Sequence, residues 1–172
     1  TNAGVQYILV AGNNKLYKKT TTTLTELTYG GGGVAPTITT SNWQFDSISG
    51  IGYFFQRGYD PLIFDPSVST TTYRRVSEHA SYSGTVNQCN IVLSAYGRLW
   101  IADTSTDKNT VKWSNTSSGV AWTGGTSGTL DLTSVWPNGT DEITALGAHN
   151  GALVIFGKKQ ILIYTGAHNP TT

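Results

Sequence analysis

The stretch Ala95–Trp113, AYGRLWIADTSTDKNTVKW, consists of two apolar runs on either side of a polar loop. The first run, Leu99–Ala102, is almost continuously apolar, whereas the second, Thr110–Trp113, alternates between apolar and polar residues. A continuous apolar run followed by a turn-rich loop is typical of a strand buried on both faces. The loop contains aspartate, lysine and asparagine, and aspartate and asparagine favour turns. The stretch therefore predicts a hairpin whose first strand lies deep in a core.

The composition of the whole chain favours sheets. Of its 172 residues, 27 are threonine, 20 are glycine and only 12% are charged. Threonine and aromatic residues suit pleated surfaces, and glycine suits turns. The net charge of +1 argues against a dedicated nucleic-acid-binding protein, which would need a basic surface. Because the chain has no methionine and begins at Thr1, we expect it to be a piece of a longer protein.

The hairpin pattern recurs along the chain. Four glycines open a run of apolar residues, and a polar turn and a second apolar run follow each of them: Gly4, Gly52, Gly97 and Gly151. Their separations of 48, 45 and 54 residues resemble the period of β-propeller blades, about 40–50 residues. We therefore predict an all-β fold, a partial β-propeller of about four blade-like antiparallel meanders within residues 1–172. The expected units are roughly 1–29, 43–78, 88–133 and 142–166, with linkers rich in glycine, serine and threonine.

Within each unit, the inner strands should be apolar and the outer strand polar or alternating. Leu99–Ala102 and Leu153–Phe156 fit inner strands, and three segments fit outer strands: Leu24–Thr28, Thr72–Val76 and Leu130–Thr133. The turn between the first and second strands is expected at Asn150–Gly151, Tyr96–Gly97 and Ile51–Gly52. The first unit lacks a first strand. Gly30–Gly33 is expected to be a flexible connector.

Few residues have the type and spacing that a catalytic or metal-binding site requires. Asp103 and Asp107 could bind calcium, but the loop lacks the spacing of a calcium-binding loop, so a hairpin tip is the better interpretation. The three histidines lack metal-ligand spacing, and the single cysteine, Cys89, is expected to be buried. We therefore predict no catalytic residue, no metal and no cofactor, and a protein that is not an enzyme.

Tryptophans supply the other candidates. Trp100 and Trp113 lie in expected strands and should pack between sheets, whereas Trp43, Trp122 and Trp136 lie near loops and are expected to be more exposed. The candidate interaction residues are therefore Asp103, Asp107, Lys108, Trp122 and Trp136.

A carbohydrate-active or carbohydrate-binding propeller, sialidase-like or lectin-like, is the alternative hypothesis. Sialidase propellers carry a Ser-x-Asp-x-Gly-x-Thr-Trp turn, of which only Gly119 and Trp122 are found here at the matching places. Four arginines could form a cluster for an acidic sugar: Arg57, Arg74, Arg75 and Arg98. A third hypothesis is a monomeric propeller adaptor that binds peptides.

Two stretches resemble a known family. Tyr96–Ser114 and Gly128–Asn150, with the continuation to Gly166, are similar to the tail nozzle proteins of short-tailed bacteriophages, also called tail tubular protein B, and to the related packaged-DNA stabilisation proteins. The resemblance covers residues 90–170, and residues 1–85 fit it only by the form of the repeat.

The resemblance implies a structural virion protein. It would form a ring, expected to be a homo-hexamer, that contacts portal or adaptor and tail fibre proteins, retains packaged DNA and lets it pass without specific binding. Such a protein would be assembled in the cytoplasm of the bacterial host and located in the phage tail. No apolar run reaches the ~20 residues of a membrane helix, so no membrane anchor is expected.

Overall fold

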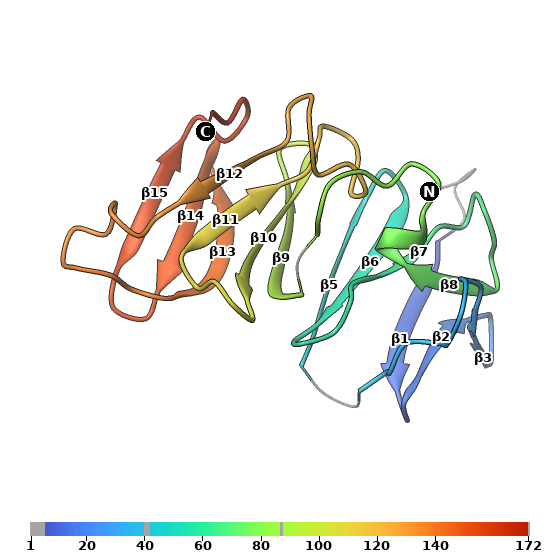
Figure 1. The fold of residues 1–172 in the computed structure, drawn as a ribbon. Coiled ribbons are helices and arrows are strands. Elements are labelled where there is room, and N and C mark those ends of the chain that lie inside the picture. Colours follow the sequence, from blue (N-terminus) through green and yellow to red (C-terminus); the bar gives the residue numbers. More distant parts are fainter. Residues whose placement is uncertain (1–5, 40–41, 87, 172) are drawn as a thin grey trace.

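The computed structural model describes residues 6–39, 42–86 and 88–171, which form four β-sheets in chain order (Figure 1). A short 3-10 turn, Val76–Glu78, follows the second sheet. Sheet 1 consists of β1 (Ile8–Gly12), β2 (Lys15–Lys19) and β3 (Leu24–Glu26). Sheet 2 consists of β4 (Thr28–Tyr29), β8 (Thr72–Arg75), β7 (Leu62–Phe64), β6 (Ile51–Gln56) and β5 (Trp43–Ile48), in this spatial order.

The second half of the chain forms the other two sheets. Sheet 3 consists of β12 (Gly128–Asp131), β11 (Thr110–Trp113), β10 (Arg98–Thr104) and β9 (Cys89–Ala95), in this spatial order. Sheet 4 consists of β13 (Ile143–His149), β14 (Ala152–Gly157) and β15 (Ile161–Thr165). The prediction of an all-β fold is therefore confirmed, and neighbouring strands pair antiparallel except for β4, which pairs parallel with β8.

Two-residue turns join the first two strands of sheets 2, 3 and 4. Each turn has two residues with positive φ: Ser49 and Gly50 (54° and 78°), Tyr96 and Gly97 (54° and 73°), and Asn150 and Gly151 (44° and 81°). Positive φ at both positions matches the right-handed twist of the flanking strands. The expected turns at Tyr96–Gly97 and Asn150–Gly151 are confirmed. The expected turn at Ile51–Gly52 is wrong, because Ile51 and Gly52 already belong to β6 and the chain turns two residues earlier.

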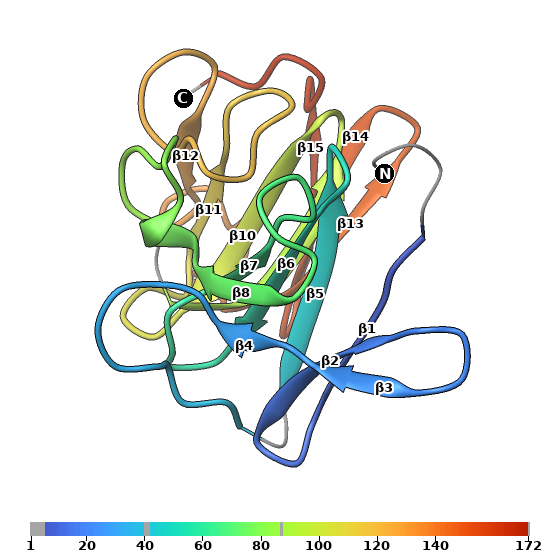
Figure 2. The ribbon, with the colours of Figure 1, turned by 90° about the vertical axis from the view of Figure 1, so that its right-hand side faces the viewer.

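The sheets lie in a row, and each pair of neighbours shares an apolar core. Phe54 and Leu62 of sheet 2 pack with Leu16 of sheet 1, whereas Phe55 packs with Leu99 of sheet 3. The core between sheets 3 and 4 is the largest, and its buried side chains include Trp100, Trp113, Trp136, Leu153 and Ile155. Figure 2 looks along this row. Sheets 1 and 4 lie at opposite ends of the row in Figure 1, so the described residues do not form a closed propeller.

The first strands of sheets 2, 3 and 4 lie side by side. β5 contacts β9, and β9 contacts β13. Asp46 of β5 ties two of these strands together, because its Oδ2 accepts a hydrogen bond from the backbone N–H of Ser94 in β9 at 2.6 Å. We call β5, β9 and β13 the inner strands.

The connection between sheets 1 and 2 differs from the expectation. The expected outer strand Leu24–Thr28 ends at Glu26, and Thr28–Tyr29 instead pairs parallel with β8 of sheet 2. The glycine run after it is held in place, since the N–H of Gly30 donates to Tyr73 O at 2.8 Å and that of Gly32 to Glu78 Oε1 at 3.1 Å. A flexible connector is therefore the wrong description. The expected opening glycine of the first unit, Gly4, lies outside the described residues.

Candidate interaction surfaces

The loop after β10 is the tip of a hairpin, as predicted, and its polar groups are used internally. Thr104 Oγ1 donates to Asp107 O at 3.0 Å and accepts from the N–H of Asp107 at 2.9 Å. Asp107 Oδ1 in turn accepts from the N–H of Asn109 at 2.9 Å. Within the described residues, no group of three or more histidine, cysteine, aspartate or glutamate side chains could hold a metal ion.

Asp103 is a buried carboxylate rather than an exposed interaction residue. It is 6% exposed and has a positive φ of 56°. Its two oxygens accept hydrogen bonds from Arg57 Nη2, in the loop after β6, and from Lys108 Nζ. Because Arg57 belongs to sheet 2 and Asp103 to sheet 3, this ion pair joins two sheets at one end of the row. The expectation that Asp103 is available to a partner is therefore wrong, whereas Asp107 and Lys108 are half-buried.

A charged cavity of 270 Å³ lies beside this ion pair. Its walls include Arg57, Asp103 and Lys108 together with Glu142 and Lys158, which form their own ion pair at 2.8 Å. Each cation in the wall contacts a carboxylate, but Arg57 and Lys108 share Asp103, so these five groups carry a formal excess of one positive charge. The cavity joins three successive sheets.

The two candidate tryptophans pack between sheets. Trp136 is 5% exposed, lies in the core between sheets 3 and 4, and donates from Nε1 to Asn109 Oδ1 at 3.1 Å. Trp122 is half-buried against the core between sheets 2 and 3 and donates to Gly119 O at 3.0 Å. Trp43 is likewise half-buried, with its ring edge-on to Phe54. The expectation that Trp136 is exposed is wrong, because the chain folds back over sheet 3 after β12.

The expected packing of Trp100 and Trp113 is confirmed. Both are almost completely buried, and their ring centroids are 5.3 Å apart. Cys89 is also buried, as predicted, and burial raises the pKa of its thiol well above the ordinary value. A buried thiol with a raised pKa is unreactive.

Arg98 is a feature that the sequence did not predict. Its side chain is buried, and its guanidinium donates to Thr126 O at 2.7 Å, Thr116 Oγ1 at 3.1 Å and Ser114 O at 3.4 Å. Burial lowers its pKa. Arg98 thus organises the serine- and threonine-rich loop that follows β11. Its neighbour Gly97 marks the turn, but no signal in the sequence distinguishes this arginine from exposed ones.

Three of the four arginines that could have formed a cluster have separate roles. Arg57 pairs with Asp103, Arg98 binds carbonyl and hydroxyl groups, and Arg75 contacts Glu78 at 3.3 Å and Asp60 at 3.5 Å. These three side chains therefore do not form an arginine cluster for an acidic sugar.

Tyr29, Arg75 and Glu78 form a compact polar cluster at the edge of sheet 2. Tyr29 Oη donates to Glu78 Oε1 and accepts from Arg75 Nη1. Burial and the hydrogen bond to Glu78 raise the pKa of Tyr29 to about 12. Burial would raise the pKa of Glu78, but hydrogen bonds from Tyr29 and Arg75 and the guanidinium charge outweigh it and hold that pKa below its ordinary value. The tyrosine therefore stays protonated and the glutamate ionised at neutral pH.

The outer face of sheet 4 is apolar and uncovered. Alternate residues of its strands point toward sheet 3, so the remaining ones point away from it. These outward residues form the open face: Ala145, Gly147, His149, Ala152, Val154, Phe156, Ile161, Ile163 and Thr165. Ile161 and Ile163 are 60% and 67% exposed. The open face contains no lysine, arginine, aspartate or glutamate.

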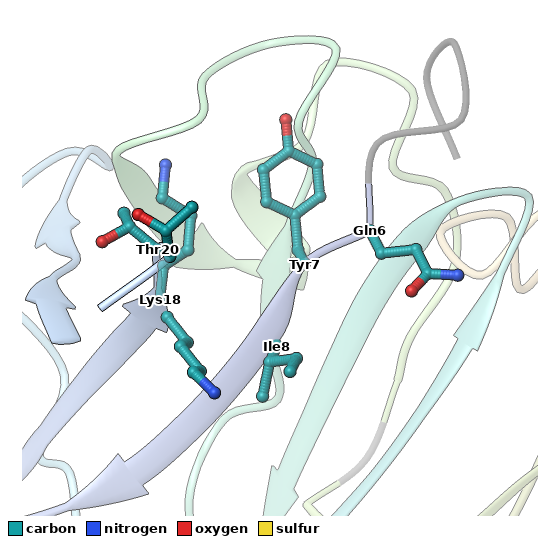
Figure 3. Close-up of a pocket in the computed structure, with 7 residues that line it drawn as sticks. Gln6, Tyr7, Ile8, Lys18 and Thr20 are labelled. Atoms are coloured by element: carbon teal, nitrogen blue, oxygen red, sulfur yellow. The ribbon is translucent and has the colours of Figure 1, made fainter. Parts of the chain in front are cut away.

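The opposite end of the row is more polar. Ile8, Val10 and Leu24 of sheet 1 are exposed there, but Lys15 and Glu26 form an ion pair at 2.6 Å on neighbouring strands. Two cavities lie beside β1. The first, of 560 Å³, is bounded by the start of β1 and by Lys18, Lys19 and Thr20 (Figure 3). The second, of 440 Å³, separates the start of β1 from β5 and β6.

The described ranges contain no helix with the length and apolar character required to cross a bilayer. No protein-family model matches the sequence, and no curated protein matches it.

Proposed function

We propose that this chain is a structural protein of a bacteriophage tail nozzle, in which its four sheets are blades of a β-propeller. The observation that supports the proposal is the open face of sheet 4. A row of sheets that cover each other's apolar faces, and that ends in an uncovered apolar face without formal charge, is suited to further assembly. Sheets 2 and 3 each pack against two neighbours, whereas sheets 1 and 4, at the ends of the row, each pack against one.

The positions of the two faces of β14 support this interpretation. Leu153 and Ile155 are buried against sheet 3, whereas Val154 and Phe156 on the other face have no sheet against them in the described residues. In β10, both alternating sets are buried, Trp100 and Ala102 against sheet 4 and Leu99 and Ile101 against sheet 2. A further sheet on β14 would repeat the packing of β10.

The charge of the inner strands suits a passage for DNA. β5, β9 and β13 contain no lysine or arginine, and their one carboxylate, Asp46, is bound to backbone N–H groups. Affinity for DNA depends on cationic groups that displace counterions from phosphates. A surface built from these strands would let DNA slide past without retaining it by charge.

In this proposal, copies of the protein form a homo-oligomeric ring, expected to be a hexamer, in the phage tail. Portal or adaptor proteins would lie above it and tail fibre proteins beside it, and the ring would be assembled in the host cytoplasm. Electron microscopy of the purified natural protein tests the proposal. We expect rings with six-fold symmetry, and separate monomers at high protein concentration would overturn it.

A carbohydrate-directed function is the second candidate, and the cluster of Tyr29, Arg75 and Glu78 favours it. A tyrosine, a carboxylate and an arginine in mutual contact, with Asp60 beside the arginine, are chemically suited to an acidic sugar. In the structure all of these groups bind one another and the glycine run. Turnover of chromogenic glycosides by the natural protein and by Glu78→Gln tests this candidate. Activity that disappears in the variant would support it, and the absence of turnover in both proteins would rule out glycoside hydrolysis for these substrates.

A further inference from the structure

In the described residues, sheet 1 has no counterpart of the inner strands of the other three sheets. The inner strands β5, β9 and β13 form one edge of sheets 2, 3 and 4, and in sheet 1 that edge is formed by β1. β1 corresponds to the second strand of the other sheets. Its sequence places Tyr7 and Leu9 three and five residues after Gly4, as Trp100 and Ala102 lie three and five residues after Gly97.

The packing supports the same correspondence. Trp100 and Ala102 face the next sheet along the row, and Tyr7 and Leu9 likewise pack into the core shared with the next sheet, sheet 2. The free edge of β1 is therefore the edge at which an inner strand pairs in the other three sheets. In the described residues, β1 pairs only with β2.

A groove occupies the place where this strand would lie. The 440 Å³ cavity is bounded by Ile8 and Leu9 on one side and by Phe45, Gly52 and Phe54 of sheet 2 on the other. Phe45 is 70% exposed and Ile8 56%. Large apolar side chains are thus left in water beside unpaired strand backbone, a combination that invites strand addition.

We propose that the groove between β1 and β5 is a docking site for one extended strand of a partner polypeptide. The strand would pair antiparallel with the free edge of β1 and cover Phe45, so that it continues the row of inner strands β13, β9 and β5. Main-chain hydrogen bonds to β1 would supply affinity, and the pockets beside Phe45 and Ile8 would select alternate apolar side chains.

The chemistry of the occupant follows from the groove. The only acidic or basic side chain in its wall is Asp46, whose two oxygens already accept hydrogen bonds from the backbone N–H groups of Ser47 and Ser94. A charge on the inward side of the incoming strand would therefore be buried without a partner. We expect an uncharged segment with alternating apolar residues, like the sequence CNIVLSA of β9, which fills the equivalent position in sheet 3.

A separate extended segment fits better than a second copy of the chain. Each described strand is already paired within a sheet, so a second copy could offer only a sheet edge, such as that of β15, and would bring a whole sheet with it. The groove is bounded on both sides by sheets 1 and 2, so an occupant that brings a whole sheet with it would meet both of them. This inference depends on the arrangement of the sheets and not on the proposed role in a virion.

Peptide binding tests the proposal. The probe is a fluorescent peptide with the sequence of residues 88–95, with Cys89→Ser and two added terminal lysines for solubility. We expect saturable binding to the protein and slower hydrogen exchange of the backbone amides of β1. A control peptide with glutamate at alternate positions should bind at least tenfold more weakly. Absence of saturable binding, or equal binding of both peptides, would overturn the proposal.

A pair of variants locates the site. Phe45→Ser removes the exposed ring in the groove and should weaken binding at least tenfold. Phe156→Ser removes a partly exposed ring from the open face of sheet 4 and should leave binding unchanged. If Phe156→Ser is the weaker binder, or if exchange slows in β15 instead of β1, the site is not the groove. Dimers that protect β1 without any peptide would show that a second copy is the occupant, which would also overturn the proposal.

Discussion

Sheets 3 and 4 have similar strands and different surroundings. β10 and β14 are both second strands that follow a two-residue turn, and both are rich in apolar residues. All seven residues of β10 are buried, because sheets 2 and 4 cover its two faces. β14 is covered on one face only, so Phe156 remains exposed. An apolar strand therefore contributes to stability within this chain only where a neighbouring sheet excludes water from it.

An isoleucine-to-alanine substitution should lower the free energy of unfolding much more in sheet 3 than in sheet 4, and this is the largest effect we expect. Ile101 is fully buried in β10, and Ile163 is 67% exposed in β15. Ile101→Ala should lower the free energy of unfolding by about 2–5 kcal/mol, because it leaves a cavity. Ile163→Ala should change it by less than about 0.5 kcal/mol. Urea denaturation measures both values, and equal losses would mean that sheet 4 is covered in the isolated protein.

Substitutions of two glycines compare how tightly side chains pack between two sheets and on the open face. A Cβ at Gly119 would lie 2.4 Å from Tyr53 Cζ and 2.6 Å from Leu99 Cδ1, between sheets 2 and 3. A Cβ at Gly147, on the open face, would meet its nearest neighbour, Phe156 Cε2, at 3.4 Å. Gly119→Ala should therefore cost about 1–3 kcal/mol through overpacking, and Gly147→Ala much less. Thermal unfolding of the two variants checks this, and a neutral Gly119→Ala would contradict the tight contact between the sheets.

Acid should weaken the covered part of the molecule more than the open face. The pKa of Glu78 in the folded protein lies below its ordinary value of 4.5, so its ionised form stabilises the fold above that pH. This contribution is lost as the pH falls through the lowered pKa. Glu78→Gln should cost about 1 kcal/mol at neutral pH and flatten the acid dependence of the unfolding free energy below pH ~5. An unchanged pH profile would mean that the cluster with Tyr29 and Arg75 adds no stability.

A charge on the open face should have the smallest effect on folding but a clear effect on assembly. Ile163→Lys should change the free energy of unfolding by less than about 0.5 kcal/mol and abolish self-association, since a buried unpaired ammonium is costly. Ser134→Lys adds the same charge at another exposed position and serves as the control. Sedimentation velocity distinguishes the two variants. Association that survives Ile163→Lys would place the contact between copies elsewhere.

Local signals in the sequence predicted the local structure well. The hairpin at Asn150–Gly151 follows from two residues that favour positive φ, and that at Tyr96–Gly97 from its glycine alone. The buried strand at Leu99–Ala102 follows from a continuous apolar run. The turn before β6 was misplaced by two residues, because Ser49–Gly50 and Ile51–Gly52 both end in glycine and only strand pairing distinguishes them.

The candidate interaction residues were harder to predict. Aspartate and tryptophan near loops were expected at the surface, yet Asp103 is buried in an ion pair with Arg57 of the neighbouring sheet and Trp136 fills a core. Whether a loop residue is exposed depends on which distant segments of the chain pack over it. In both positions the covering groups lie on another sheet or on a segment more than twenty residues away.

The sequence by itself determined the strands, most of their turns and the repeated sheet, because hydrophobic alternation and turn residues act over a few neighbouring positions. Only the tertiary structure decided which apolar faces are covered. The sequence of β14 is even more apolar than that of β10, yet β10 is the strand that is buried on both faces, because neighbouring sheets cover it on two sides. The sequence also predicted that the first unit lacks its first strand, but only the tertiary structure shows the groove that lies between β1 and β5 at that place.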